Sequence, residues 1–124
     1  MPEWILVVGS DKRSCFELID VLRAHEYQAV CSFTLIDIEA VLEEAGCRVI
    51  IFDLDSIPLD NRILKQLKKL HMDLCILAIS ERPFHPELKE SMATHIYASL
   101  NKPVDPYELI YLVKGIFRAT RSTK

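Results

Sequence analysis

Uninterrupted apolar runs of strand length, separated by segments of helical period, constrain this fold more than any other sequence feature. Residues 5–8, 49–52 and 74–79 contain no polar side chain. A strand with one face in water alternates polar and apolar residues, so such runs indicate strands that are buried on both faces. Burial on both faces requires helices on each side of a parallel sheet. The pattern predicts an α/β fold: a five-stranded parallel sheet, doubly wound as (βα)5, in a three-layer sandwich.

The remaining elements follow from weaker signals. Two less apolar runs, 28–33 and 98–100, complete the five strands. Pro86 is suited to the first turn of a helix, and Asp105 followed by Pro106 is typical of an N-cap and the first helical position. Helices are therefore expected at 14–25, 38–45, 63–70 and 86–97, and from 105 onward.

Length and charge limit the classes of protein that remain. The chain has 124 residues and a formal net charge of −3, which disfavours direct binding of nucleic acid. No apolar run approaches the roughly 20 residues that span a bilayer, and the N-terminus lacks a basic leader region. We expect one domain over residues 1–121, a tail or linker start at 122–124, a cytoplasmic location and no membrane partner. The four cysteines form no CxxC pair and are expected to be reduced core residues.

Three chemically complementary residues follow three of the predicted strands. Asp53 ends the third apolar run, Ser80 follows the fourth, and Lys102 follows the fifth. The carboxyl ends of parallel strands share one edge of the sheet, which is where ligands bind in such folds. A carboxylate, a hydroxyl and an ammonium would meet there. This trio could hold a phosphoryl group, with the carboxylate as acceptor and the other two as ligands of its oxygens.

On these residues the chain resembles, along essentially its whole length, the receiver domain of two-component response regulators, the flavodoxin-like CheY fold. The resemblance implies that Asp53 matches the phosphoacceptor, Ser80 the switch hydroxyl, and Lys102 the lysine that bridges acceptor and phosphoryl oxygens. It also implies a cis peptide bond before Pro103. The matching segments are ILVVGSD, VIIFDLDSIP, LAISE and LNKPVDPYEL.

The acidic pair that holds Mg²⁺ in receivers is missing. Gly9 and Ser10 stand at those positions, and neutral replacements weaken binding of a hard cation sharply. Asp11 lies one position late and could form a metal site with Asp53 only if the loop were rebuilt. We therefore expect no cofactor, or weak Mg²⁺ binding at most. Ser99 also replaces the aromatic switch residue of the family.

Two structural hypotheses follow for the pocket. Lys102 is expected to pair with Asp53 as a permanent bridge. Asp55 and Arg82 occupy positions that flank the pocket mouth in this fold, so their charged groups are expected to approach within about 6 Å and partly cover the pocket. The predicted rim consists of Asp11, Asp55, Glu81 and Arg82. The four histidines, His25, His71, His85 and His95, are expected at the surface without matched partners.

The outer side of the last helix is the candidate interaction surface. In receivers the fourth helix, fifth strand and fifth helix form the usual dimer or partner surface, and a solvated face is the alternative interpretation. The candidate residues are Phe84, Tyr107, Tyr111, Lys114 and Arg118.

The leading functional hypothesis is a degenerate receiver, or pseudo-receiver: a non-enzymatic regulatory module that binds a histidine kinase or an output domain, for example in transcription regulation. At most it would accept a phosphoryl group on Asp53 in a phosphorelay. One alternative is a working receiver in which Asp11 helps Asp53 bind Mg²⁺. Another is a flavodoxin-like carrier of flavin or nucleotide, which is disfavoured because neither GxGxxG nor GxxxxGK[ST] is present.

Overall fold

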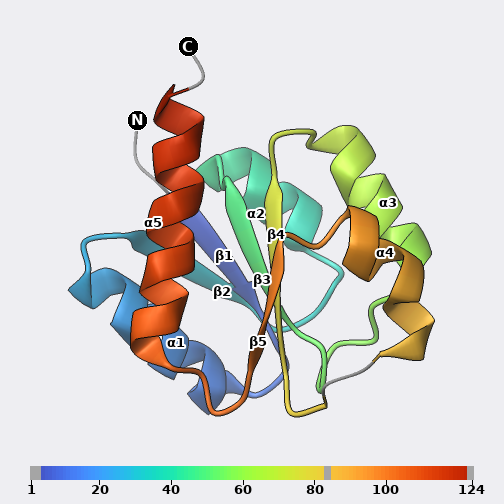
Figure 1. Ribbon diagram of the computed structural model, residues 1–124, viewed down its shortest axis with the longest axis horizontal. Coiled ribbons are helices and arrows are strands. Elements are labelled where there is room, and N and C mark those ends of the chain that lie inside the picture. The colour runs from blue at the N-terminus through green and yellow to red at the C-terminus, as the bar shows by residue number, and fades with distance from the viewer. Residues whose placement is uncertain (1–3, 83–84, 123–124) are drawn as a thin grey trace.

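The computed structural model describes residues 4–82 and 85–122, and these form a parallel sheet covered by helices on both faces (Figure 1). The strand order is β2-β1-β3-β4-β5, and every neighbouring pair is parallel. The predicted fold class is therefore confirmed. The strands are β1 (Trp4–Val8), β2 (Gln28–Ser32), β3 (Val49–Asp53), β4 (Cys75–Ser80) and β5 (Ala98–Asn101).

The helices divide into two layers. One face of the sheet carries α1 and α5, and the other carries α2, α3 and α4 (Figure 1). A short 3₁₀ helix, Pro86–Leu88, leads into α4. The bounds are α1 (Lys12–Ala24), α2 (Ile38–Ala45), α3 (Asn61–Leu70), α4 (Lys89–Thr94) and α5 (Pro106–Ser122). None of the described helices is long and apolar enough to cross a membrane.

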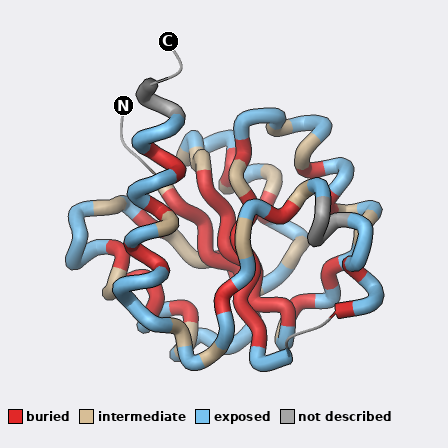
Figure 2. Tube along the Cα trace, in the orientation of Figure 1, coloured by how far each residue is buried: buried red, intermediate tan, exposed pale blue. Residues whose placement is uncertain are grey.

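Alternate residues of each central strand feed two separate cores. In β1, Ile5 and Val7 pack on the side of α1 and α5, whereas Leu6 and Val8 pack on the side of α2, α3 and α4. This alternation follows from the two-residue period of a strand. All four residues are at most 1 % exposed, and Figure 2 shows the buried band running through the middle of the sheet. The strands are therefore apolar without interruption because both of their faces are buried, as the sequence indicated.

Capping residues position the loops at the edge where the strands end. The carboxylate of Asp11 accepts a hydrogen bond from the backbone N–H of Arg13 and so caps α1. Asp60 caps α3 in the same way, and the N–H of Tyr107 donates to Asp105 in the first turn of α5. The predicted cis peptide bond between Lys102 and Pro103 is present.

The segment 86–97 is less helical than predicted. The chain leaves α4 at Thr94, and the N–H of Tyr97 donates to the carbonyl of Ile76 at 2.7 Å. This bond aligns the chain with the edge of β4 before β5 begins. The need to enter the sheet therefore shortens the helix.

The four cysteines are free thiols. Cys15 is buried, and burial is the main reason that its pKa rises to about 12. Cys31, Cys47 and Cys75 are half-buried, and burial raises the pKa of each. Raised pKa values keep the thiols protonated at neutral pH, in agreement with a packing role.

Candidate functional site

The carboxyl ends of β3, β4 and β5 meet at the lower edge of the sheet in Figure 1. Asp53 is the last residue of β3, Ser80 is the last residue of β4, and Lys102 directly follows β5. The backbone N–H of Lys102 donates to the carbonyl of Ser80 at 3.0 Å, which places the lysine beside the end of β4. The predicted convergence of the three residues is therefore observed.

Lys102 and Asp53 form the predicted ion pair. The distance from Lys102 Nζ to Asp53 Oδ1 is 2.8 Å, and Asp53 is only 5 % exposed. The backbone N–H of Asp55 donates to the same oxygen at 3.0 Å. A charged hydrogen bond of this length in a buried position is strong, because water competes poorly for either partner.

Asp55 also enters the pocket, which the sequence analysis placed only at its rim. Its Oδ2 lies 3.0 Å from Lys102 Nζ and accepts the backbone N–H of Glu81 at 2.8 Å. Its Oδ1 accepts the hydroxyl of Ser80 at 3.0 Å. Lys102 therefore contacts two carboxylates, and Asp55 connects the ends of β4 and β5.

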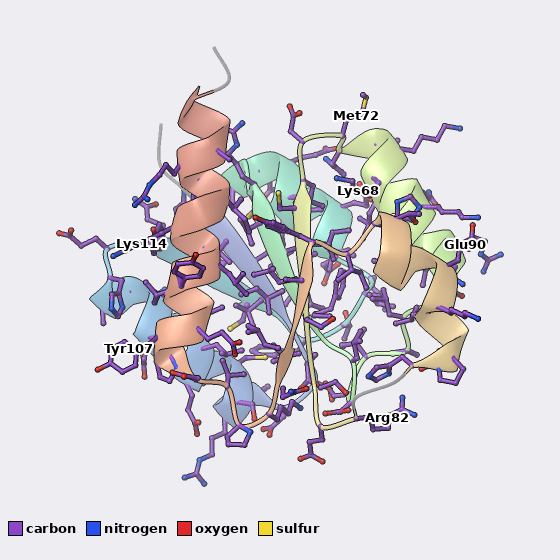
Figure 3. The ribbon with its side chains drawn as sticks, in the orientation of Figure 1. Lys68, Met72, Arg82, Glu90, Tyr107 and Lys114 are labelled. Atoms are coloured by element: carbon purple, nitrogen blue, oxygen red, sulfur yellow. The ribbon has the colours of Figure 1, made fainter. Side chains whose placement is uncertain are left out.

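Among the described residues, the approach expected between Asp55 and Arg82 does not take the form of an ion pair. Within the described ranges, Arg82 has its ion pair with Glu87, at 3.2 Å, and no ion pair joins it to Asp55. Arg82 approaches the pocket through its backbone instead, because its N–H donates to Ser80 Oγ at 2.9 Å. Figure 3 shows the Arg82 side chain at the lower edge of the molecule. Lys102 already neutralises Asp55 within the pocket. The guanidinium of Arg82 pairs with the exposed carboxylate of Glu87 instead.

His85 is buried and hydrogen-bonded, contrary to the expectation of unpartnered surface histidines. It is 3 % exposed, and its Nε2 lies 2.7 Å from Ser80 Oγ. Its Nδ1 lies 2.9 Å from Nη2 of Arg82, and a guanidinium can only donate. Nδ1 also lies 3.4 Å from Glu87 Oε1, but the Arg82 contact is the shorter, so Nδ1 accepts and Nε2 carries the proton that is donated to Ser80. The position of His85 in the loop after β4, at the carboxyl edge of the sheet, is the sequence signal that could have identified it.

The other histidines differ among themselves. His71 Nε2 lies 2.9 Å from Glu39 Oε2, so it too has a partner that the sequence analysis missed. His25 Nδ1 contacts the carbonyl of Val21 within its own helix. Neither is near the pocket that contains Lys102.

Asp11 has its hydrogen-bond partners in the first turn of α1. Its carboxylate is exposed and accepts the hydroxyl of Ser14 at 2.8 Å and the N–H of Arg13 at 3.2 Å. The hydrogen bond from Ser14 is the main reason that the pKa of Asp11 lies below its usual value. The residue is therefore engaged as a helix cap, and in the described part of the chain it belongs to no group of three His, Cys, Asp or Glu side chains that could hold a metal.

The donor set at this edge does not fit Mg²⁺. Gly9 and Ser10 offer no carboxylate, and in the described part of the chain no three His, Cys, Asp or Glu side chains form a metal-binding group. A Cβ at Gly9 would lie 3.1 Å from Asp53 Cβ and 3.1 Å from Cys15 Sγ. An acid at this position would require its neighbours to shift. One of the two Asp53 oxygens, Oδ1, already contacts the Lys102 ammonium.

The pKa shifts agree with an ionised network. Burial alone would raise the pKa of Asp55, but hydrogen bonds from Glu81, Lys102 and Ser80 outweigh it and hold the pKa below 3.8. Burial alone would lower the pKa of Lys102, but hydrogen bonds and charges of Asp53 and Asp55 outweigh it and hold the pKa above 10.5. Both groups are therefore charged at neutral pH.

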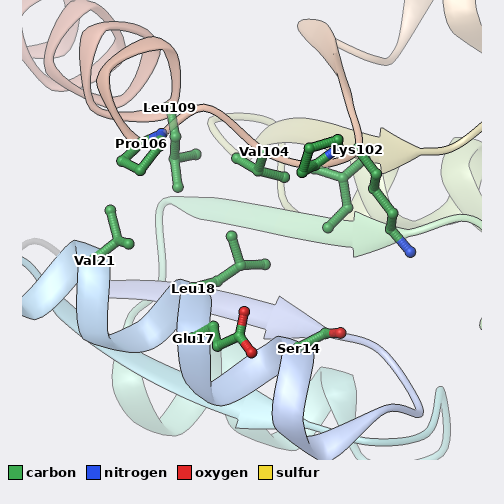
Figure 4. A pocket seen from close by; sticks show the side chains of 10 residues that line it. Ser14, Glu17, Leu18, Val21, Lys102, Val104, Pro106 and Leu109 are labelled. Atoms are coloured by element: carbon green, nitrogen blue, oxygen red, sulfur yellow. The ribbon is translucent and has the colours of Figure 1, made fainter.

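A separate groove lies between α1 and the segment that joins β5 to α5. Its volume is about 330 Å³, and Leu18, Val21 and Leu109 contribute to its mainly apolar lining. Figure 4 shows the ammonium of Lys102 pointing away from these side chains. Lys102 therefore lines the groove, while its ammonium belongs to the ion-pair site with Asp53 and Asp55.

Glu81 contributes its backbone to the site, while the residue itself is exposed. Ser99 is an exposed residue of β5. Phe84, a candidate for the interaction surface, lies outside the described residues.

Comparison with known proteins supports the fold. No family model and no curated protein matches the sequence. Among solved structures, a CheY-like response regulator receiver domain from Methanospirillum hungatei JF-1 matches at a TM-score of 0.84 and 19 % identity, over 100 % of both chains.

Two further structures match nearly as fully. The signal receiver domain of an HD domain-containing protein from Pseudomonas fluorescens Pf-5 has a TM-score of 0.85 and 17 % identity, over 98 % of this chain and 99 % of that one. A dimer of beryllofluoride-activated NtrC4 receiver domains has a TM-score of 0.81 and 20 % identity, over 94 % and 97 %. The chain therefore has the CheY-like receiver fold.

Proposed function

We propose that this chain is an atypical receiver: a signal-transduction interaction module whose state does not depend on Mg²⁺-assisted phosphorylation of Asp53. The observation that carries the proposal is the position of Lys102 between two carboxylates, at 2.8 Å from Asp53 and 3.0 Å from Asp55. The lysine that receivers use toward a phosphoryl group is already neutralised here by the protein itself.

Electrostatics support the same proposal. A phosphodonor brings negative charge to a carboxylate, and Mg²⁺ normally offsets the repulsion. Gly9 and Ser10 supply no acidic ligand for such an ion. A phosphoryl group on Asp53 would also have to displace the Asp55 carboxylate from Lys102. Both features disfavour transfer to this site.

The proposed partners are proteins: an output domain, a histidine kinase or a second copy of the chain. The face formed by α4, β5 and α5 supports this, because it exposes aromatic side chains beside positive charge. Tyr107 and Tyr111 are 84 % and 79 % exposed, and Tyr111 and Lys114 line one groove. Figure 3 shows Tyr107 and Lys114 on α5. Tyrosine is enriched at protein interfaces. Within this proposal the chain is cytoplasmic, is no enzyme, and does not itself bind nucleic acid.

The proposal is tested by phosphotransfer. The purified chain is incubated with Mg²⁺ and acetyl phosphate, and its intact mass is measured beside that of a receiver with the acidic pair. We expect the control receiver to gain one phosphoryl group and this chain to gain none. A gain that disappears in Asp53→Asn would contradict the proposal and support the alternative, a working receiver.

A further inference from the structure

The loop after β3 carries a carboxylate across to the ends of β4 and β5. We infer that Asp55 is the built-in ligand of an oxyanion cradle formed by Ser80 Oγ, the Glu81 backbone N–H and Lys102 Nζ, and that it keeps this cradle filled without any covalent modification. The inference deepens the proposed function and rests on it. In this arrangement the Asp55 carboxylate takes the place of an added phosphoryl group.

Three donors from two parts of the chain, the end of β4 and the residue after β5, converge on this one carboxylate. Ser80 donates to Oδ1 at 3.0 Å, while Glu81 and Lys102 donate to Oδ2 at 2.8 Å and 3.0 Å. A hydroxyl, a backbone amide and an ammonium are typical ligands for the oxygens of a small anion. Both oxygens of Asp55 are used, so the carboxylate satisfies all three donors at once.

The loop backbone holds Asp55 in this position. Leu54 donates its N–H to the carbonyl of Ile79 at 3.0 Å, which ties the start of the loop to β4. Ile57 donates to the carbonyl of Asp53 at 3.1 Å and closes a turn around residue 55. The N–H of Asp55 itself bonds to the Asp53 carboxylate. The side chain of Asp55 is 22 % exposed, so water reaches it only in part.

Ser80 is oriented toward Asp55 by the groups behind it. Its oxygen accepts the N–H of Arg82 at 2.9 Å and the Nε2–H of His85 at 2.7 Å. Both acceptor positions are then occupied, so the hydroxyl proton can only point to the carboxylate of Asp55. The loop after β4, which holds Arg82 and His85, is thereby connected through Ser80 to the anion in the cradle.

A cradle of this kind should accept an outside anion once its own ligand is removed. Asp55→Ala leaves Ser80, Glu81 and Lys102 in place and deletes only the carboxylate. The matching probes are formate and acetate, which carry the same functional group. Chloride at equal ionic strength controls for screening, which affects exposed charges throughout the protein.

The experiment compares the wild type, Asp55→Ala and Asp20→Ala, which removes an exposed acid of α1. We expect Asp55→Ala to lower the Tm by roughly 5–10 °C, because three donors, two of them partly buried, lose their acceptor, and Asp20→Ala to change it little. Formate or acetate should restore part of the loss in Asp55→Ala alone. It should also return the amide proton resonance of Glu81 toward its wild-type position.

Two outcomes would overturn the inference: an unchanged Glu81 amide in Asp55→Ala, or equal stabilisation of all three proteins by formate. If Asp55→Ala does not fold, Asp55→Asn keeps the side-chain shape without the charge. The Glu81 amide resonance should then move upfield, and a wild-type resonance would reject the inference. Adding Ser80→Ala to whichever variant folds should reduce any rescue by formate, and an undiminished rescue would place the anion elsewhere.

The inference and the proposed function can fail separately. Phosphorylation of the wild-type chain on Asp53 would reject the proposed function even if formate rescues Asp55→Ala. A chain that takes up no phosphoryl group, together with no rescue and an unmoved Glu81 amide, would reject only the role of Asp55.

Discussion

At the scale of single residues, the site depends on a lysine that contacts two acids. Lys102 is half-buried, its side chain 22 % exposed, and Asp53 is nearly inaccessible to water. Charges in such a position are stable only when they are paired, since the removal of one partner leaves the other desolvated. The pocket therefore contributes to stability as well as to any signalling role.

Replacing Lys102 by Met should lower the free energy of unfolding by about 3 kcal/mol, because Asp53 and Asp55 lose their counter-ion. Urea denaturation followed by circular dichroism measures the difference. Lys114→Met, at an exposed position of α5, is the matched control and should change stability by less than about 0.5 kcal/mol. Equal stability of the two variants would count against the bridge.

The sequence could predict some of these residues and not others. Asp53, Ser80 and Lys102 lie at or directly beside strand ends, and the register of a parallel sheet determines where such residues meet. Asp55, Arg82 and His85 lie in loops, where the choice of partner depends on backbone turns that no periodic pattern reveals. The central pair of Lys102 and Asp53 could therefore be predicted from the sequence, whereas the ion pair of Arg82 with Glu87 could not.

At the scale of elements, α5 performs two tasks with opposite faces. Leu109 and Val113 are fully buried against the sheet, whereas Tyr107 and Tyr111 are largely exposed. The helical period explains how one segment serves both, and the sequence was sufficient to predict the buried side. The neighbouring α4 was predicted less well, because the edge of β4 draws the chain into β5 and shortens the helix.

If the face of α4, β5 and α5 binds a second copy or an output domain, a charge placed on it should weaken the association. Tyr111→Glu is expected to shift the chain toward the monomer, or to abolish binding of the output domain, as measured by light scattering or calorimetry. Met72→Glu is the control, because Met72 is equally exposed, at 79 %, but follows α3. The same loss of binding in both variants would show that this face is not the interface.

At the scale of the whole molecule, the central strands are buried on both faces and the chemistry is confined to one edge. This separation is the reason that the fold could be predicted from apolar runs alone. The absence of the Mg²⁺-binding acids was also readable in the sequence at Gly9 and Ser10. The contacts of Asp55 with Ser80, Glu81 and Lys102 were not, because they depend on how the loop after β3 turns.

The network should give the protein a specific acid sensitivity. The pKa of Asp55 is lower in the folded chain than its ordinary value of 3.8, so its stabilising effect is fully present above that pH. The effect is lost as the pH falls through the lowered pKa. Lys102 has a raised pKa, so its contribution is present below 10.5 and is lost only in strong base.

Unfolding free energies of the wild type and Asp55→Asn should therefore differ at pH 7 and converge as the pH falls below about 4. Urea titrations at several pH values measure this difference. Asp11 also has a lowered pKa, but its effect on the unfolding free energy cancels because both proteins contain it. A difference that stays constant down to pH 2 would mean that the charge of Asp55 is not part of the network.

The most direct measurement is a Mg²⁺ titration of the wild-type chain, followed by the amide resonances of residues 9–11 and 53–55. If the state of the site does not depend on Mg²⁺, these resonances should show no saturable change through the millimolar range, and the Lys102–Asp53 pair should persist. Saturable shifts at Gly9, Asp11 and Asp53 that disappear in Asp53→Asn would demonstrate a Mg²⁺ site and contradict the account.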